Sequence, residues 1–313
     1  MPELPEVETI RRALRDGGRE GPSVLNRTVE GGRLLWTGSL AAPTPRRFWP
    51  RLRGRRIRDL GRRGKFLLIE LDDLTTLALH LRMSGDVIAE PDQGPLPRFA
   101  RFVARLSGDL RLVFTDPRKF GRIWLQQDAR DLLASLGPEP LDPKLTRRAF
   151  TDRVRSRRRQ LKPLLLDQSF LAGLGNIYTD EALHAAGLHP RTPADTLTVA
   201  QTEALWRSIR RVLRAGIRRQ GSSIDWIYRG GDYQSQLRVY GRRGLPCPVC
   251  GTEIERLLVG QRGTHICSRC QPPPPNADRG AGANPGAAGS RPRPAVPDRP
   301  SAGHGVASRG ASR

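Results

Sequence analysis

The chain has 313 residues, 37% of them hydrophobic, which is enough for about two domains with buried cores. Its 54 Lys and Arg residues exceed its 31 Asp and Glu residues and give a net charge of +23, which favours a polyanionic partner, nucleic acid first. No run of 18 apolar residues occurs and the acidic N-terminus lacks a signal-peptide pattern, so we expect a cytoplasmic protein without a membrane span.

The first part of the chain has a helical pattern followed by strand patterns. Residues 5–16 place Val7, Ile10 and Leu14 on one helical face, and Pro5 suits the first turn of that helix. From about residue 24 to 126, short apolar or alternating runs lie between Gly, Asp and Pro, and their spacing predicts a β-sandwich. The clearest runs are Phe66–Leu71, Thr75–Leu81, Phe102–Leu106 and Leu110–Phe114.

Helical patterns dominate from about residue 142 to 220. Residues 197–219 carry apolar side chains at helical spacing opposite many arginines, which predicts a long amphipathic helix. Before it, a Gly-rich turn at 171–176 leads into a second helical segment at 177–186. The final stretch from Gln271 has many Pro, Gly and Arg residues and no aromatic residue, so we expect it to be disordered.

The four cysteines of the chain form two Cys-x-x-Cys pairs separated by sixteen residues. Each short pair can offer two sulfurs to one ion, and the spacer is long enough for a hairpin that brings the pairs together. The spacing predicts a closed tetrahedral zinc site with a structural role, and two disulfides are the alternative. The predicted ligands of this single Zn²⁺ are Cys247, Cys250, Cys267 and Cys270.

Several short motifs follow one another in a fixed order along residues 1–271. They are Pro2-Glu3-Leu4-Pro5-Glu6, Arg-Arg-Gly-Lys65-Phe, His80-Leu-Arg-Met83-Ser-Gly, Thr115-Asp-Pro-Arg118-Lys-Phe120-Gly, Leu136-Gly-Pro-Glu, Gly173-Leu-Gly-Asn176, Val239-Tyr-Gly-Arg and the cysteine pairs. Together these motifs resemble those of bacterial formamidopyrimidine-DNA glycosylases.

The resemblance implies a multi-domain α+β fold with three folded parts. These are an N-terminal β-sandwich with an N-terminal helix, a helix–two-turns–helix DNA-binding domain and a C-terminal zinc-finger β-hairpin. The expected boundaries are 1–132 for the catalytic domain, 133–225 for the helical domain, 226–271 for the zinc finger and 272–313 for the disordered tail.

The resemblance also implies a catalytic group at the start of the chain. Pro2 becomes the first residue once Met1 is removed, and its secondary amine can then attack an electrophilic carbon to form a Schiff base. The alternative is that Pro2 only begins the helix. Family members use Glu3 as proton donor and base in glycosidic cleavage and Lys65 as proton donor in β-elimination. The alternatives are a carboxylate that complements the helix dipole and a solvated hairpin lysine.

Other residues match positions at which the family contacts DNA. Met83, Arg118 and Phe120 match the side chains that fill the space left by a flipped nucleotide, with core packing as the alternative for Met83 and Phe120. The Gly173–Asn176 turn would present peptide N–H groups to phosphate, unless it is only a helix cap. Arg262 matches the arginine that holds DNA and assists δ-elimination. The implied phosphate ligands are Arg158, Lys162 and Asn176.

The implied function is that of a bifunctional DNA glycosylase and AP lyase. Such an enzyme removes oxidised purines, 8-oxoguanine and formamidopyrimidines, from duplex DNA and nicks the strand by β,δ-elimination. One alternative is an endonuclease VIII-like enzyme for oxidised pyrimidines, which Leu4 disfavours because that group usually has glycine there. Another is a non-catalytic binder of damaged DNA, which Pro2, Glu3 and Lys65 disfavour. We expect a monomer that acts on double-stranded DNA in the cytoplasm, at the nucleoid.

Overall fold

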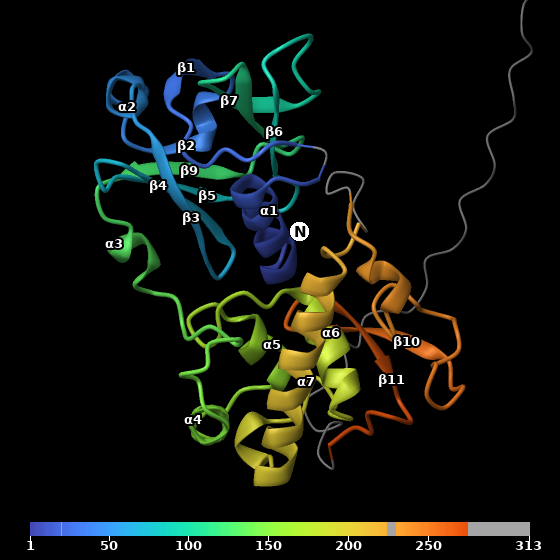
Figure 1. Cartoon of the computed structure of the whole chain (residues 1–313). Helices are drawn as coiled ribbons and strands as arrows, with labels where there is room; N and C mark the ends of the chain where they lie inside the picture. Colours follow the sequence, from blue (N-terminus) through green and yellow to red (C-terminus); the bar gives the residue numbers. More distant parts are fainter. Residues whose placement is uncertain (20, 224–229, 275–313) are drawn as a thin grey trace, which may run out of the picture. The chain divides into compact units, whose positions relative to one another are not determined.

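The computed structural model describes residues 1–19, 21–223 and 230–274, and these described residues belong to one compact unit (Figure 1). The predicted tail lies outside the described residues from position 275 on. Residues 224–229 also lie outside the described residues. Among the described residues, no helix is long and apolar enough to cross a membrane.

Two sheets form the predicted β-sandwich. The four-stranded sheet has the order β1-β7-β8-β6 and is antiparallel throughout. Its strands are β1 (Val29–Leu34), β6 (Asp86–Pro91), β7 (Ala100–Leu106) and β8 (Leu110–Thr115). The five-stranded sheet has the order β2-β9-β5-β4-β3, in which only β2 and β9 are parallel. Its strands are β2 (Leu40–Ala42), β3 (Ile57–Arg63), β4 (Phe66–Leu71), β5 (Thr76–His80) and β9 (Arg122–Gln126).

Strand alternation explains how the sandwich is held together. Leu67, Ile69 and Leu71 of β4 are buried, while the residues between them are more exposed, as expected for a strand with one face on the core. Leu67 pairs across the sheet with Leu79, so the apolar positions stay in register from strand to strand.

The remaining elements form the helical part and the hairpin. The helices are α1 (Leu4–Asp16), α2 (Pro45–Leu52), α3 (Arg130–Leu133), α4 (Arg147–Arg155), α5 (Leu161–Leu166), α6 (Asn176–Ala185) and α7 (Val199–Arg218), and the 3-10 turns are η1 (Thr37–Ser39), η2 (Ala194–Thr196) and η3 (Tyr233–Gln236). The strands β10 (Ile254–Val259) and β11 (Arg262–Cys267) form a separate antiparallel hairpin. A capping box fixes the start of α7, because Thr198 and Gln201 each accept the other's peptide N–H.

Helix α1 joins the two hydrophobic cores of the molecule. Val7, Ile10 and Leu14 are buried in the sandwich core. Leu4, one turn earlier, is fully buried in the helical core with residues of α4 to α7. The first turn of α1 is therefore held between the sandwich and the helical part, and this is where the predicted catalytic residues lie.

Candidate active site

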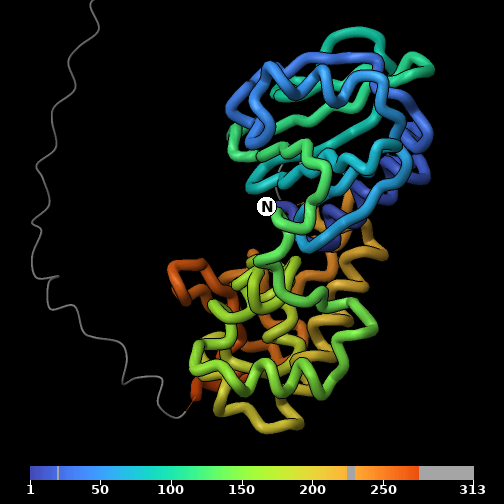
Figure 2. The backbone as a smooth tube through the Cα atoms, turned by 90° about the vertical axis from the view of Figure 1, so that its left-hand side faces the viewer, coloured from blue at the N-terminus to red at the C-terminus, as the bar shows by residue number. Residues whose placement is uncertain are grey.

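The start of the chain is buried where the β-rich and helical parts meet (Figure 2). Pro2 and Glu3 are buried, and the peptide N–H of Leu4 donates to the carbonyl of Gly173, 3.0 Å away. With Met1 attached, the nitrogen of Pro2 is a peptide nitrogen. Removal of Met1 would convert it into a secondary amine.

The Glu3 carboxyl lies at the N-terminus of α6. It accepts the peptide N–H groups of Gly175 at 2.5 Å and Ile177 at 2.8 Å. Helix N-termini bind carboxylates in this way because their first N–H groups have no partner within the helix. Burial raises the pKa of Glu3 from 4.5 to about 7, although the Lys65 ammonium and the Ile177 N–H act in the opposite direction. This carboxyl can therefore hold or release a proton near neutral pH.

The Gly-rich turn before α6 has an explanation that differs from the predicted one. A Cβ on Gly175 would lie 2.4 Å from Cδ of Glu3, and one on Gly173 would lie 2.7 Å from Cδ1 of Leu4. Gly173 also has φ +107°, which side-chain-bearing residues rarely adopt. The glycines thus admit the start of α1, and of the turn's N–H groups that of Gly175 binds Glu3 and that of Gly173 binds Gln168.

Glu6 anchors the same turn of α1 from the other side. Its carboxyl is 2% exposed and accepts the Tyr178 hydroxyl at 2.7 Å and the Ser222 peptide N–H at 2.8 Å. It also accepts the peptide N–H of Glu3 at 2.8 Å. Because its oxygens already have these donors, Glu6 positions the N-terminal peptide and ties it to α6 and to the end of α7.

Lys65 lies in the turn between β3 and β4 and is 6% exposed. Burial lowers the pKa of its ammonium, while the charges of Glu3 and Glu6 act in the opposite direction and that of Arg262 adds to the lowering. These interactions place Lys65 near the carboxyls of Glu3 and Glu6. Glu139 holds the turn in place, because it accepts both terminal nitrogens of Arg62 at 3.0 Å.

Met83, Arg118 and Phe120 lie on two neighbouring turns of the sandwich. Met83 is half-buried, Arg118 is exposed, and the Phe120 ring is 49% exposed with the Arg118 guanidinium 5.0 Å from its centre. A buried carboxylate, Asp116, joins the turns: it accepts the Ser84 hydroxyl from one and the Gly121 N–H at 2.7 Å from the other. The structure thus offers an exposed apolar and cationic group at one place.

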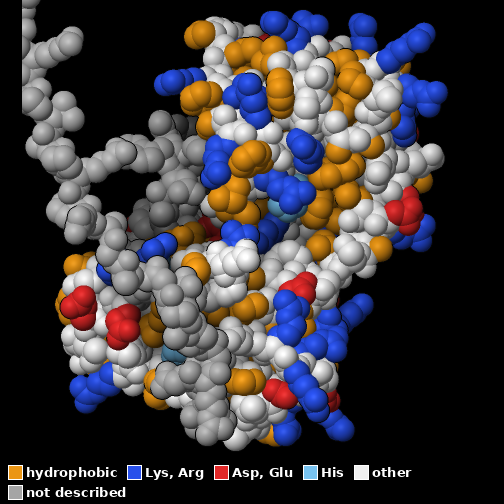
Figure 3. All heavy atoms as spheres, turned by 180° about the vertical axis from the view of Figure 1, so that it is seen from behind, with side chains coloured by type: hydrophobic (Ala, Val, Ile, Leu, Met, Phe, Trp, Pro, Cys, Tyr) orange, Lys and Arg blue, Asp and Glu red, His pale blue; other side chains and the backbone are white. Residues whose placement is uncertain are grey.

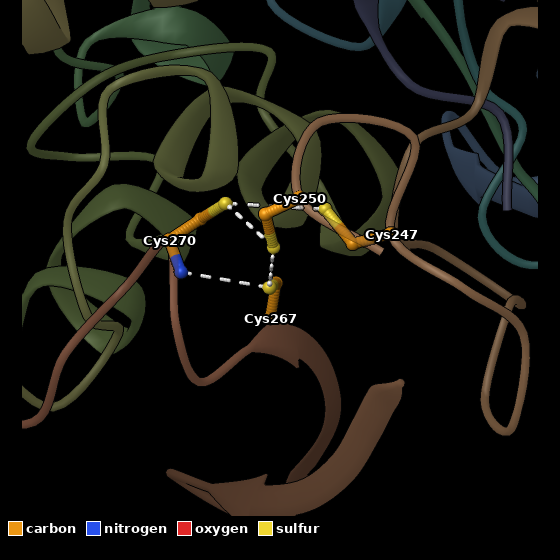
Figure 4. Close-up of side chains that lie close together, drawn as sticks. All are labelled: Cys247, Cys250, Cys267 and Cys270. Atoms are coloured by element: carbon orange, nitrogen blue, oxygen red, sulfur yellow. Dashed lines mark hydrogen bonds between the residues drawn. The ribbon is translucent and has the colours of Figure 1, made fainter. Parts of the chain in front are cut away.

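The four cysteines converge as predicted (Figure 4). Their sulfurs lie within 4.8 Å of one another, with 3.3 Å between those of Cys250 and Cys267 and 3.9 Å between those of Cys247 and Cys270. A disulfide would need about 2.05 Å, whereas 2.3 Å bonds to a tetrahedral ion place sulfurs about 3.8 Å apart. The set therefore fits one structural zinc with all four positions filled.

The hairpin that carries Arg262 is held against the helical part next to that residue. Arg262 is exposed at the start of β11, and the carbonyl of the next residue, Gly263, accepts Lys162 Nζ and Asn176 Nδ2, both at 3.0 Å. The Lys162 ammonium also pairs with Asp180 at 2.6 Å, and both side chains are fully buried. Lys162 therefore does not present its charge to a DNA phosphate, contrary to the prediction, and instead locks the hairpin.

The predicted residues do not all lie together in the structure. Lys65 is within electrostatic range of Glu3 and of Arg262. Arg158 is separate from them, with a side chain 94% exposed and only a 3.9 Å contact to Asp195. Figure 3 shows Lys and Arg side chains spread over much of the face opposite to that of Figure 1.

The sequence analysis assigned no role to three residues that hold the predicted site residues in place. Asp116 could have been found, because it also accepts the N–H two residues on, as an Asp in a turn often does. Glu139 stands in the motif Leu136-Gly-Pro-Glu, but nothing local indicated its partners, and His184 had no local signal. The partners of Glu139 are more than 70 residues away, and His184 Nε2 lies 3.5 Å from the sulfur of Cys247 on another element.

Comparisons with known proteins agree along nearly the whole described chain. Residues 1–123 match the family model of the formamidopyrimidine-DNA glycosylase N-terminal domain, and residues 136–227 match that of the H2TH domain of the same proteins. Residues 244–273 match a zinc finger found in FPG and IleRS.

Individual relatives are similar over the same length. A Chloroflexus aggregans protein named formamidopyrimidine-DNA glycosylase is 48% identical over 280 residues, or 87% of this chain and 98% of that protein. Its counterpart from Chloroflexus aurantiacus is 45% identical over 278 residues, with the same shares. Lactococcus lactis Fpg (MutM), solved with DNA that contains N7-benzyl-Fapy-dG, superposes with a TM-score of 0.80 at 34% identity and covers 87% of this chain and 100% of its own. MutM bound to DNA with carbocyclic 8-oxo-G gives the same TM-score, identity and coverage.

Proposed function

Because this chain belongs to the formamidopyrimidine-DNA glycosylase family, we propose that the Pro2 amine, exposed by removal of Met1, is the nucleophile of its reaction. The enzyme removes oxidised purines from duplex DNA and cleaves the resulting abasic site. The observation that carries the proposal is the burial of Pro2 beside a carboxyl and a lysine, each with a perturbed pKa.

In the first step, the neutral Pro2 nitrogen attacks C1′ of the damaged nucleotide. The C1′–N bond to the base breaks, and the base leaves with its bonding electrons and a proton. An α-amino group has a pKa of about 7.7–8.0, so a useful fraction of the amine is neutral at pH 7. Because Pro2 is held by the Leu4–Gly173 contact, the reacting atoms need little further ordering.

Glu3 then supplies the proton that opens the sugar. The C1′–O4′ bond breaks, O4′ takes a proton from the carboxyl, and the nitrogen lone pair completes the iminium. A carboxyl with a pKa of about 7 is half protonated at neutral pH and suits both halves of this exchange. Its hydrogen bonds to Gly175 and Ile177 hold it in place while the proton moves.

Lys65 and Arg262 serve the two elimination steps. Loss of a C2′ proton from the iminium expels the 3′ phosphate, and a second elimination expels the 5′ phosphate. We assign Lys65 to proton transfer in the first elimination, since burial lowers the pKa of its ammonium. The fixed charge of exposed Arg262 suits the leaving phosphate, and the zinc finger holds the hairpin that presents it.

The damaged nucleotide must leave the helix before this chemistry can occur. We assign Met83 and Phe120 to the space that it vacates and Arg118 to the unpaired base opposite, since apolar side chains and a cation lie together there. Arg158, almost fully exposed, is assigned to backbone phosphate. Asn176 is also assigned to backbone phosphate: one hydrogen of its Nδ2 donates to Gly263, and the second is left to donate to a phosphate oxygen.

We also propose the domain division 1–132, 133–225 and 226–271, in which most residues of each hydrophobic cluster come from one part, although Leu4 and Tyr233 join the helical core from outside it. Since the substrate is chromosomal DNA, we place the protein in the cytoplasm at the nucleoid, as a monomer.

Borohydride trapping tests the nucleophile. Reduction during reaction with an 8-oxoguanine duplex should convert the iminium into a stable protein–DNA adduct, visible as a shifted band. A form with an N-terminal extension keeps every side chain but blocks the amine, and it should give no adduct. Pro2→Gly retains a primary amine and reports only on the proline ring. An undiminished adduct with the blocked form would refute the assignment.

The lesion class is tested with matched duplexes. We expect cleavage of 8-oxoguanine and formamidopyrimidine substrates to exceed that of thymine glycol by at least about tenfold, the scale on which a pocket discriminates similar groups. A preference for thymine glycol would favour the endonuclease VIII-like alternative.

A further inference from the structure

A pocket with arginines around its rim lies on the helical part, between α6, α7 and η3. It encloses about 320 Å³. The guanidinium groups of Arg211, Arg218, Arg219 and Arg238 line it, and all four residues are exposed. The ring of Tyr233, 3% exposed, forms part of its wall. We refer to this site as the arginine pocket.

The positive charge of the arginine pocket is only partly compensated. Its one lining carboxylate, Glu181, is buried and accepts the peptide N–H groups of residues 238–240, so its oxygens face the backbone. Asp232 pairs with Arg219 at 2.6 Å. Within residues 1–19, 21–223 and 230–274, no carboxylate lies within ion-pair distance of Arg211 or Arg218.

A third unpaired arginine extends the same surface along α7. Arg214 is exposed, and no carboxylate of the described part of the chain pairs with it. Positions 211, 214 and 218 are three and four residues apart and so share one face of the helix, where like charges repel. They span about 10 Å of helix axis at 1.5 Å per residue. A bound polyanion would relieve this repulsion, and a concave cationic site concentrates such a partner.

The arginine pocket differs from the site of the reaction. The catalytic carboxyl Glu3 binds the first residues of α6, whereas the pocket is lined by Glu181 and Ala185 near the end of that helix. Figure 1 shows α6 and α7 side by side. The ring of Tyr233 separates the two sites, since it stacks on Tyr178 at 5.1 Å, and Tyr178 donates to Glu6.

We propose that the arginine pocket and Arg214 form a second binding site for the phosphate backbone of duplex DNA, outside the segment that holds the lesion. The length of the surface favours a polymer over a single small anion, because about 10 Å of duplex axis carries roughly six phosphate charges. Guanidinium groups bind phosphate oxygens through two parallel hydrogen bonds, which suits arginine to this partner. The site would keep the enzyme on DNA between lesions.

The test uses protein in which the catalytic cleft is already filled. Borohydride-trapped adduct with a short lesion duplex is purified, and a fluorescent undamaged duplex of about 20 base pairs is titrated into it by anisotropy. The adduct should bind the second duplex. In Arg211→Gln/Arg214→Gln/Arg218→Gln, binding should weaken at least about tenfold and the salt slope should fall by about 2–3, for three phosphate contacts at about 0.9 each.

A matched control separates a site from general charge. Arg46→Gln/Arg47→Gln/Arg51→Gln removes the same charge from exposed positions of α2 and should change binding by less than about threefold. Equal losses in both triple variants, or no binding by the wild-type adduct, would overturn the proposal. The proposal would also be overturned if the α7 triple variant still bound the duplex but no longer bound phosphatidylglycerol vesicles.

A second measurement does not depend on the adduct. If no adduct forms, the Pro2 assignment fails, and the salt slope of free protein on an undamaged duplex of about 40 base pairs still tests the arginine pocket. The slope should be lower by about 2–3 in the α7 triple variant than in the α2 triple variant. Equal slopes contradict the second site.

Discussion

Replacing Gly175 with alanine should separate the Glu3 carboxyl from the N-terminus of α6. The added Cβ would lie 2.4 Å from Cδ and 2.5 Å from Oε1 of Glu3. Carbon atoms pack at about 3.5–4.0 Å, so the carboxyl must move by about 1 Å. That movement breaks the 2.5 Å and 2.8 Å bonds from Gly175 and Ile177.

The expected loss is large for catalysis and small for DNA binding. Displacement of a reacting group by about 1 Å lowers a rate by about 100-fold, which corresponds to about 2.7 kcal/mol of transition-state stabilisation. Hydrogen bonds to a charged group contribute about 1.5–3 kcal/mol each, so the loss of two is sufficient for this effect. Affinity for the lesion duplex should stay within about threefold, because Gly175 carries no side chain that could contact DNA.

Single-turnover excision of 8-oxoguanine from a labelled duplex measures the rate, and thermal unfolding checks the fold. Gly61→Ala is the matched control, since the nearest atoms to its added Cβ lie at 3.7 Å and 3.9 Å. It should react as fast as wild type. A Gly175→Ala enzyme within about threefold of wild type would show that the carboxyl does not depend on this helix terminus, and the reasoning would be wrong.

Four further changes test other parts of the site. The excision rate should fall as the pH rises through about 7, because the pKa of Glu3 is about 7 and only its protonated form donates a proton. The Glu3→Gln enzyme should react much more slowly, and its rate should not show this fall with pH. Asp116→Ala should lower the free energy of unfolding by about 2–4 kcal/mol in urea titration and reduce base flipping reported by 2-aminopurine, since two turns lose their common acceptor. Lys162→Met should destabilise the protein by about 3–5 kcal/mol, because it leaves the buried charge of Asp180 unpaired, and adding Asp180→Leu should recover part of that loss in a double-mutant cycle. Cys267→Ala should lose its zinc, measured by atomic absorption, and should no longer bind the lesion duplex, measured by anisotropy, while the Pro2 amine stays intact. Full DNA binding without the metal would contradict the structural role of the zinc.

Much of the fold could be predicted because its signals are local. Alternating runs such as Phe66–Leu71 and the helical face at 199–218 identify elements from neighbouring residues alone, and the family motifs order them. The cysteine spacing predicted the metal site for the same reason. Each of these signals lies within one element or one turn.

The side-chain partners could not be predicted in this way. The family resemblance implied a contact with DNA phosphate at position 162, but the partner of that residue in the structure is an aspartate 18 positions away. The Gly-x-Gly turn pointed to phosphate, but the N–H of Gly175 binds the carboxyl of Glu3, 172 residues earlier. A sequence pattern identifies a group that needs a partner of opposite charge, whereas only the fold determines which residue or ligand is that partner.

The anchoring of the first turn of α1 has a consequence for the order of events during synthesis. Glu6 is held by Ser222, 216 residues later, and ribosomes add about 5–20 residues per second, so roughly 11–43 s pass before that partner exists. During this interval the N-terminal methionine extends from a nascent chain that has not yet closed over it. We therefore expect removal of Met1, on which the proposed role of Pro2 depends, to precede burial of the first turn of α1. The contacts that hold the proposed nucleophile are thus completed only after residue 222 has been synthesised.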